Sequence, residues 1–298
     1  MNEQSHARFR SILSVLTTLL AFLLAACALQ GCALRARGAA SLAPPPTDVA
    51  QIGELKPGLW RGYLTQSELP DSLALLPPPP AAGSAAQQAD AAAYQDTRAL
   101  ARGPRGLLAT EDANLKFPAS ANAFACALGF EVDPARSPQL AALLRRSFTD
   151  AARVTLRAKR HYQRVRPFVA NHAHSCTPDD DAALAKDGSY PSGHSSLGWT
   201  WALILSELVP DQANAIQQRG VAYAESRVIC GAHWRSDTVA GRLLGSATVA
   251  REHADPVFEA QLRAAKPEVA MLRARPQPMQ RDCAAEAAAL RLSGSSAP

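Results

Sequence analysis

Residues 191–205 read PSGHSSLGWTWALIL, and this stretch predicts the central helix of the fold. Ser192 is a good N-cap, because its hydroxyl can accept a hydrogen bond from a free backbone N–H of the first helical turn. The residues that follow are apolar nearly all round the helix, which is typical of a helix buried in the middle of a core. The uncharged run ends at Glu207. It is therefore too short to cross a bilayer, which needs about 20 apolar residues.

The composition extends this prediction to the rest of the chain. The 298 residues are 47% hydrophobic but only 6% aromatic. Alanine and leucine dominate, and β-branched runs and alternating strands are scarce, which favours helices. Further helices are expected over residues 138–165 and 210–229, and in a stretch that ends near Asp255. We therefore predict an all-α fold, a single-domain helical bundle.

The N-terminus has the pattern of an export signal. Arg8 and Arg10 precede Ser11–Leu34, which holds no charged residue. Such a basic start followed by an apolar run and small residues is typical of secretion signals, although a retained membrane anchor is the alternative. We predict an export signal over residues 1–31, a tether over 32–70, the folded domain over 71–266 and a peripheral C-terminal tail over 267–298.

Two cysteines in this region are candidates for lipid attachment. Leu24-Ala25-Ala26-Cys27 and Leu29-Gln30-Gly31-Cys32 both resemble the lipobox of bacterial lipoproteins. The small residues before Cys27 favour cleavage at that position. The number of cysteines favours Cys32 instead, because acylation of Cys32 after cleavage there leaves four cysteines, which can all pair. The expected location is the periplasm, with a lipid anchor in the outer membrane as a further option.

The other four cysteines suggest two disulfides, since an exported chain meets an oxidising compartment. Three pairings are conceivable, and buried free thiols are the alternative. We favour Cys176–Cys230. Each of these cysteines lies close in sequence to one of the motifs described below, and those motifs must come together in the fold. Cys126–Cys283 would then tie the C-terminal tail to the body. No CxxC pair is present, so a zinc site is not expected.

The charge balance excludes one class of partner. The formal net charge is +5, with no lysine- or arginine-rich block and no recognisable nucleic-acid-binding motif. Nucleic acid is therefore not expected as a partner. A small positive balance is compatible with attracting small anions.

Three short motifs in the second half of the chain carry chemistry. The first is Lys159-x6-Arg166-Pro167. Seven residues correspond to about two helical turns, so both cations can point the same way and bind an anion with several oxygens. The plain alternative is a solvated helix face.

The second motif is Pro191-Ser192-Gly193-His194. Gly193 leaves the backbone open to a ligand, and the free N–H groups of a helix N-terminus favour an anion. The Ser192 hydroxyl can add a further hydrogen bond, and His194 would lie at the rim of the anion site. The plain alternative is a helix cap with an incidental histidine.

The third motif, Ser226-Arg227-x5-His233-x3-Asp237, is the sharpest. Arg227 offers a planar fork of donors for phosphate oxygens. His233 and Asp237 are four residues apart, so the carboxylate can accept a hydrogen bond from one ring nitrogen and leave the other free to attack. A structural His–Asp pair is the alternative.

In this order the motifs resemble the signature of the type 2 phosphatidic acid phosphatase superfamily, with every fixed position matched. The surrounding sequence is more similar still to the bacterial class A non-specific acid phosphatases, over roughly residues 75–256. The stretches that carry this closer resemblance are Leu75-Leu76-Pro77-Pro78-Pro79-Pro80, Glu111-Asp112-Ala113-Asn114, Lys186-Asp187-Gly188-Ser189-Tyr190 and Ser226-Arg227-Val228-Ile229-Cys230-Gly231.

The resemblance implies a helical bundle of the type 2 phosphatidic acid phosphatase kind and hydrolysis of small phosphomonoesters through a phosphohistidine, without a cofactor or metal. His233 would be the nucleophile, Asp237 its orienting carboxylate and His194 the general acid and then base. The residues that would hold the phosphate are Lys159, Arg166, Ser192, Gly193 and Arg227.

Several alternatives stay open at this point. Lipid phosphatases and vanadate-dependent haloperoxidases share the three-part motif, although lipid phosphatases usually carry several membrane spans. A phosphate-binding envelope lipoprotein without activity is the non-enzymatic alternative. His172-x-His174 could be interpreted as a metal site, but we treat it as loop sequence near Cys176. The oligomeric state does not follow from the sequence.

Overall fold

The structure is a computed structural model that describes residues 44–294, and side chains as far as residue 292. The compact unit begins at Pro44. The predicted export signal and the lipidation candidates Cys27 and Cys32 lie outside the described residues, so the structure does not test them.

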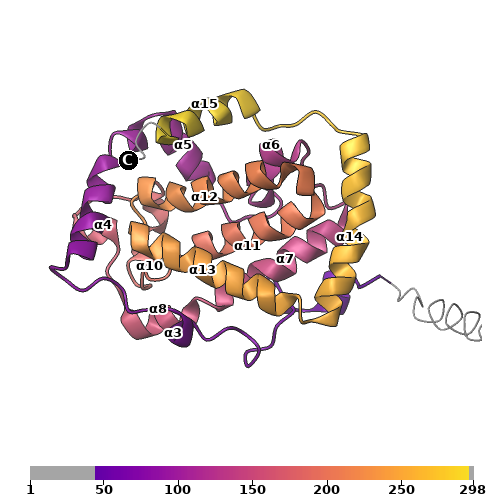
Figure 1. The fold of residues 1–298 in the computed structure, drawn as a ribbon, viewed down its shortest axis with the longest axis horizontal. Helices are drawn as coiled ribbons and strands as arrows, with labels where there is room; N and C mark the ends of the chain where they lie inside the picture. The colour runs from indigo at the N-terminus through magenta and orange to yellow at the C-terminus, as the bar shows by residue number, and fades with distance from the viewer. Residues whose placement is uncertain (1–43, 295–298) are drawn as a thin grey trace, which may run out of the picture. The chain divides into compact units, whose positions relative to one another are not determined.

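The predicted central helix lies at the middle of the bundle. It is α11 (Gly193–Leu208), and it packs against α7 (Pro138–Arg153), α12 (Ala213–Ile229) and α13 (Arg235–Glu252) (Figure 1). Trp201 of α11 is fully buried, and its indole N–H donates to the carbonyl of Leu144 on α7. As expected, the Ser192 hydroxyl caps this helix by accepting from the N–H of Ser195.

A glycine lets α13 come close to the first turn of α11. A Cβ on Gly241 would lie 2.4 Å from the carbonyl oxygen of Ser192, a distance that no side chain tolerates. The N–H of Ser192 also donates to the carbonyl of Asp237, at 2.9 Å. The second and third motifs therefore meet at this contact.

Other helices surround these four, with α15 lying over α5, α14 along one edge and α4 at the opposite end (Figure 1). The remaining α-helices are α2 (Val49–Ile52), α3 (Ser72–Leu75), α4 (Ala85–Asp96), α5 (Pro104–Glu111), α6 (Ala125–Leu128), α8 (Leu156–Tyr162), α9 (Pro167–Ala170), α10 (Asp181–Leu184), α14 (Pro256–Ala274) and α15 (Cys283–Gly294). Short 3₁₀ helices span Leu100–Arg102, Ala121–Phe124, Pro178–Asp180 and Pro210–Gln212.

The all-α prediction is confirmed, with one small exception. Strands β1 (Glu54–Lys56) and β2 (Leu59–Trp60) form an antiparallel hairpin, which is the only sheet in the described part of the chain. Its strands are too short to give an alternating pattern in the sequence.

The helix predicted over residues 138–165 is in fact two helices. Helix α7 ends at Arg153, α8 begins at Leu156, and Gln163 ends α8 in the left-handed region with φ of 44°. Arg166 is extended, with φ −75° and ψ 152°, as expected for a residue before proline. Lys159 and Arg166 therefore do not share a helix.

The predicted limits of the folded domain need correction at both sides. Tyr63 and Leu64 belong to the buried core, and their N–H groups donate to the Asp150 carboxylate at 2.7 and 3.2 Å. Val269 and Leu272 of α14 are buried in the same core. Residues 44–70 and the segment from 267 to at least α15 are therefore part of the compact unit, whereas the sequence suggested a tether and a peripheral tail.

Both predicted disulfides are confirmed. Cys126–Cys283 joins α6 to α15, and Cys176–Cys230 joins the loop after α9 to the end of α12. Within residues 44–294, no helix combines the length and the apolar character that crossing a membrane would require.

Candidate active site

The three motifs converge on one pocket of about 220 Å³. It opens where α8, the start of α11 and the turn before α13 approach one another. The polar side chains on its wall are those of Thr155, Lys159, Arg166, Asp187, His194 and His233. The apolar side of the wall is formed mainly by Leu115, Phe148, Leu156, Leu184 and Leu197. The wall thus combines cations that suit an anion with apolar side chains that suit the organic part of a ligand.

Lys159 and Arg166 both reach the loop before α11. The Lys159 ammonium lies 3.0 Å from Asp187 Oδ2 and also donates to the carbonyl of Gly188. Arg166 Nη2 lies 3.1 Å from the same carboxylate oxygen. Burial, and then the charge of Arg166, lower the pKa of Lys159 to about 8. Asp187 is half exposed, so its carboxylate can give way to a ligand that offers the same two cations more oxygens.

Arg166 also fixes the state of the His233 ring. Its Nε donates to the carbonyls of Leu184 and Asp187, and its Nη1 donates to the carbonyl of Ala232 at 3.0 Å. The same Nη1 lies 3.1 Å from His233 Nε2. Because a guanidinium can only donate, Nε2 must accept and carries a lone pair. The proton of the neutral ring is then on Nδ1.

Asp237 lies on the Nδ1 side of this ring. Its Oδ2 is 3.5 Å from His233 Nδ1 and accepts from the backbone N–H of Trp234 at 2.8 Å. Both side chains are almost completely buried. Nδ1 makes no hydrogen bond at this distance, but the order of groups, carboxylate, Nδ1–H and a lone pair on Nε2, is the one expected for a histidine nucleophile.

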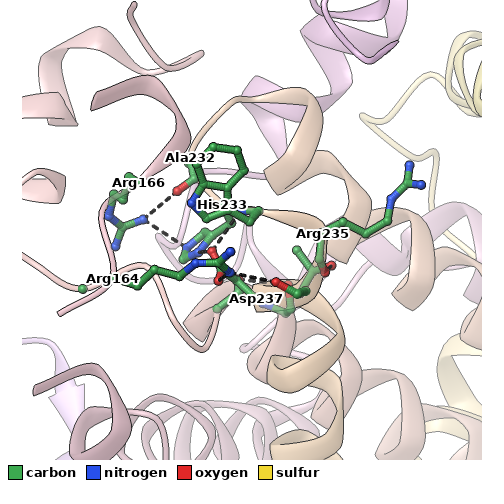
Figure 2. A network of polar contacts seen from close by, with 12 residues as sticks. Arg164, Arg166, Ala232, His233, Arg235 and Asp237 are labelled. Atoms are coloured by element: carbon green, nitrogen blue, oxygen red, sulfur yellow. Dashed lines mark hydrogen bonds and ion pairs between the residues drawn. The ribbon is translucent and has the colours of Figure 1, made fainter. Parts of the chain in front are cut away.

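A further arginine, which the sequence analysis did not select, holds Asp237 from the other side. Arg164 Nη1 lies 2.6 Å from Asp237 Oδ1, and its Nη2 lies 2.8 Å from Asp90 Oδ2 on α4. Figure 2 shows Arg164 and Arg166 reaching Asp237 and His233 from the same side, while Arg235 points away from them. The only signal in the sequence is that Arg164 stands two residues before Arg166.

The turn between α12 and α13 brings the backbone of His233 next to that of Arg227. Gly231 has φ of 77°, which allows the chain to turn sharply, and the N–H of His233 donates to the carbonyl of Arg227 at 3.2 Å. The disulfide partner Cys176 donates its N–H to the carbonyl of Cys230 at 2.9 Å, which fixes the turn to the loop after α9.

Arg227 is buried without a carboxylate partner among residues 44–294. Within this part of the chain, the only hydrogen bond of its guanidinium is a 3.7 Å contact from Nη1 to the sulfur of Cys230, and Nε has no partner. Burial lowers the pKa of Arg227 to about 10, so the group stays charged at any physiological pH. A buried cation without a counterion is costly, and a bound anion would supply what it lacks.

Gly193 is open toward the pocket. A Cβ added there would lie 3.8 Å from the nearest protein atom, Thr155 Oγ1, which is an ordinary contact. Packing of the protein therefore does not require glycine at this position, and close approach of a ligand to the backbone is the better reason for it. Ser192 is fully buried at the same helix start, where its hydroxyl also accepts from Ser195 Oγ at 2.9 Å.

His194 stands on the first turn of α11 and lines the same pocket as His233. Its Nε2 lies 3.1 Å from the carbonyl of Ala113. A carbonyl can only accept, so Nε2 carries a proton and Nδ1 is the nitrogen that can exchange one. Burial, and then the charge of Arg227, lower the pKa of His194 well below 6.5, and the pKa of His233 is lowered for the same kinds of reason.

The histidines that suggested a metal have other surroundings. His174 Nδ1 lies 3.0 Å from Asp181 Oδ2. His172 is exposed and has a positive φ of 50°. In the described part of the chain, no three histidine, cysteine, aspartate or glutamate side chains are arranged to hold a metal ion. The three motifs thus come together, and this histidine pair stays outside the pocket.

Comparison with known proteins agrees with these motifs. The model of the PAP2 superfamily matches residues 140–256. The non-specific acid phosphatase of Providencia stuartii is 43% identical over 231 residues, which cover 77% of this chain and 91% of that protein. The acid phosphatase of Zymomonas mobilis is 42% identical over 67% of this chain and 75% of its own length. The non-specific acid phosphatase of Salmonella typhimurium is 38% identical over 70% of this chain and 83% of its own length.

The matched region includes all three motifs, because they lie between Lys159 and Asp237. The resemblance inferred from the motifs is therefore confirmed: the chain belongs to the PAP2 superfamily and, within it, to the family of the bacterial non-specific acid phosphatases.

Proposed function

We propose that this protein is an acid phosphatase that hydrolyses small phosphomonoesters through a phosphohistidine on His233. The observation that carries the proposal is the position of His233 Nε2. Its lone pair faces Arg166 in a pocket with Lys159 and His194, while Asp237 lies behind the ring. The relatives named acid phosphatase support the same reaction.

Phosphate binding comes first. A phosphate group is dianionic and spreads its charge over three oxygens. Lys159, Arg166 and Arg227 together offer enough donors for these oxygens, and the free N–H groups at the start of α11 add to them. The cations are already in place and already desolvated, so little reorganisation is needed when charge develops on the transferring group.

Two displacements follow. His233 Nε2 attacks phosphorus, the bond from phosphorus to the ester oxygen breaks, and His194 Nδ1–H gives its proton to the leaving alcohol. Water then attacks the phosphohistidine, neutral His194 takes a proton from that water, and the phosphorus–nitrogen bond breaks to release phosphate. One histidine thus serves as nucleophile and the other as acid and then base.

The pH dependence follows from His194. Burial and the charge of Arg227 lower its pKa, so the protonated ring that the first step needs becomes common only at acid pH. A bound phosphate dianion raises that pKa again, because it stabilises the imidazolium. We therefore expect the rate to fall as the pH rises above neutrality.

The decisive experiment is the substitution His233→Ala, with His172→Ala as a matched control at an exposed histidine outside the pocket. We expect His233→Ala to abolish release of phosphate from an aryl phosphate, whereas His172→Ala keeps normal activity. Rapid quenching of the wild-type enzyme with a ³²P-labelled substrate should trap a protein-bound phosphate that is labile in acid and stable in alkali. Retained turnover in His233→Ala would refute the mechanism.

We also propose that the chain is exported to the periplasm and anchored by a lipid at Cys27 or Cys32. The pattern of residues 8–34 and the two disulfides support this, since disulfides form and persist in oxidising compartments. Expression of Cys27→Ala and Cys32→Ala variants, followed by membrane fractionation and mass spectrometry of the mature N-terminus, distinguishes the two sites. A wild-type protein that stays water-soluble with an unmodified N-terminus would exclude the anchor.

A further inference from the structure

Arg164 is tied on both of its terminal nitrogens inside the bundle. Nη1 donates to Asp237 Oδ1 at 2.6 Å and to Ser236 Oγ at 2.7 Å. Nη2 donates to Asp90 Oδ2 at 2.8 Å and to Gln87 Oε1 at 2.6 Å. The Arg164 side chain is only 8% exposed, and the two carboxylates are 4% and 0% exposed. One guanidinium is therefore shared between two buried carboxylates, and only one of them belongs to the His233 pair.

Asp90 is also fixed by hydrogen bonds. Its Oδ1 accepts from the backbone N–H of Ser236 at 2.9 Å, and its Oδ2 accepts from the Ser236 hydroxyl. These bonds join α4 to the first turn of α13, next to Asp237. The segment that carries Arg164 is fixed too, because the Trp234 indole N–H donates to the carbonyl of Val165 at 2.8 Å.

Other charged or titratable groups also act on Asp237. The ring of His233 lies on its Oδ2 side, and the positive charges of Lys159 and Arg166 act on it from α8 and from the residue before α9. The phenol of Tyr190, just before α11, is also near Asp237: burial and then Tyr162 raise the pKa of this phenol, and the charge of Asp237 adds to the effect. Arg164 is the only one of these groups that forms a hydrogen-bonded ion pair with Asp237.

The proposed reaction makes opposite demands on the two titrating sites. His194 must gain a proton, which favours acid pH, while the His233–Asp237 pair must remain free of an extra proton at the same pH. Burial by itself works against the second demand, because it raises the pKa of Asp237, and Arg164 opposes this effect. Because His233 and Asp237 interact closely, they titrate as a pair.

We propose that Arg164 is a positioning residue that keeps Asp237 ionised and aimed at His233 at acid pH, and that Asp90 limits this effect by sharing the guanidinium. Arg164 then sets the lower pH limit of activity, and Asp90 adjusts it. This inference rests on the phosphohistidine mechanism proposed above and names two residues that act through Asp237 without touching the substrate.

The test compares the pH dependence of kcat/KM for an aryl phosphate in three variants with the wild type. In Asp90→Asn, Asp237 is the only carboxylate that still pairs with the Arg164 guanidinium. We therefore expect the acid limb of the kcat/KM profile to move to lower pH by up to about one unit. Arg164→Met removes the positive charge, so the acid limb should move up by about one pH unit and kcat/KM at the optimum should fall. Arg164→Lys keeps the positive charge, so the acid limb should return close to its wild-type pH. The value of kcat/KM at the optimum should recover less, because an ammonium cannot bridge both carboxylates. Titration of the substrate is common to all the proteins and cancels in the comparison.

A purely structural role predicts a loss of activity without a shift of the limb, or shifts in the same direction for Asp90→Asn and Arg164→Met. Either result overturns the proposal. If Arg164→Met does not fold, Asp90→Asn alone decides: a downward shift supports the proposal, and an unmoved or rising limb overturns it.

A titration of the His233 ring by NMR in the same proteins needs no turnover. The apparent pKa of the ring should fall in Asp90→Asn and rise in Arg164→Met. An enzyme that is inactive or independent of His233 but shows these shifts would refute the proposed function and not the role of Arg164. Normal activity without the shifts would refute only the role of Arg164.

Discussion

Two arginines on α12 have the same side chain and nearly the same burial, but opposite surroundings. Arg219 and Arg227 are about two helical turns apart and are 2% and 1% exposed. Arg219 donates to both oxygens of Asp112 and, through Nε, to Glu286 of α15 at 3.2 Å. Arg227 has no carboxylate partner among residues 44–294, and its Nε donates to nothing there.

The pKa values differ in the same way. The neighbouring Asp112 and Glu286 carboxylates raise the pKa of Arg219 in spite of its burial, whereas burial lowers the pKa of Arg227 to about 10. Arg219 is a cation whose counterions belong to the protein, and it fastens α5 and α15 to α12. Arg227 has no such counterion among residues 44–294, which agrees with the anion-binding role proposed for it above. The two surroundings therefore predict a structural role for Arg219 and an anion-binding role for Arg227, without reference to any motif.

The largest expected effect comes from Arg227→Met. Loss of one desolvated donor to the transferring phosphoryl group should lower kcat/KM by about 10³-fold. The free energy of unfolding in buffer without anions should stay the same or rise, because an unpaired buried charge has been removed. Aryl phosphate hydrolysis and urea unfolding measure the two quantities. If the variant were active but much less stable than the wild type, Arg227 would have a structural role like that of Arg219, and the prediction would be wrong.

Arg219→Met should show the reverse pattern. It removes the ion pair of Asp112 with Arg219 and leaves Glu286 with Arg281 as its cation, so the free energy of unfolding should fall by about 3 kcal/mol or more. The folded protein, assayed at low temperature, should keep kcat within a few-fold of the wild type. Glu286→Gln is the milder control, because it keeps the shape and removes only one of the two carboxylates. A loss of kcat as large as that of Arg227→Met would remove the distinction between the two residues.

Inorganic phosphate sharpens the comparison further. An anion that binds only the folded protein stabilises it by about 2.7 kcal/mol at one hundred times its Kd. For a domain of this size that corresponds to a rise in Tm of about 5–10 °C. We expect this rise in the wild type and in Arg219→Met, and a much smaller one in Arg227→Met. Equal rises in all three proteins, measured by thermal denaturation with sulfate-free buffers, would show that Arg227 does not bind the anion.

The contrast between Arg219 and Arg227 also shows which features could be predicted from the sequence. Arg227, His233 and Asp237 were found because a reaction needs those groups at a fixed spacing, and spacing is visible in one dimension. The helical fold and the core position of α11 were found because apolar periodicity is also local. The disulfide Cys176–Cys230 followed from the requirement that the motifs converge, and Cys126–Cys283 was then the remaining pair.

The remaining features depend on contacts between distant parts of the chain. Asp90 is more than 140 residues from Asp237, and no local pattern connects them through Arg164. The core positions of Tyr63 and Val269 were missed for a similar reason, because each is buried by segments far away in sequence. The break between α7 and α8 was missed because no glycine or proline marks it: Val154 and Thr155 stand there.

The smallest expected effect concerns the coupling of Arg227 to His194. The charge of Arg227 is the second cause, after burial, of the lowered pKa of His194. His194 must be protonated to act as the acid, so kcat/KM should fall as the pH rises through its pKa in the free enzyme. Removing the charge in Arg227→Met raises that pKa, and the basic limb should therefore move to higher pH, by about one unit or less.

The profile of kcat adds an internal check on this prediction, because it reports the same group with substrate bound. The phosphate dianion raises the pKa of His194, so the basic limb of kcat in the wild type should lie at higher pH than that of kcat/KM. Arg219→Met should leave both limbs in place, because Arg219 is neutralised by its own carboxylates. If the limb moved equally in Arg219→Met and Arg227→Met, the shift would reflect the net charge of the protein, and the pairing of each arginine would have no bearing on His194.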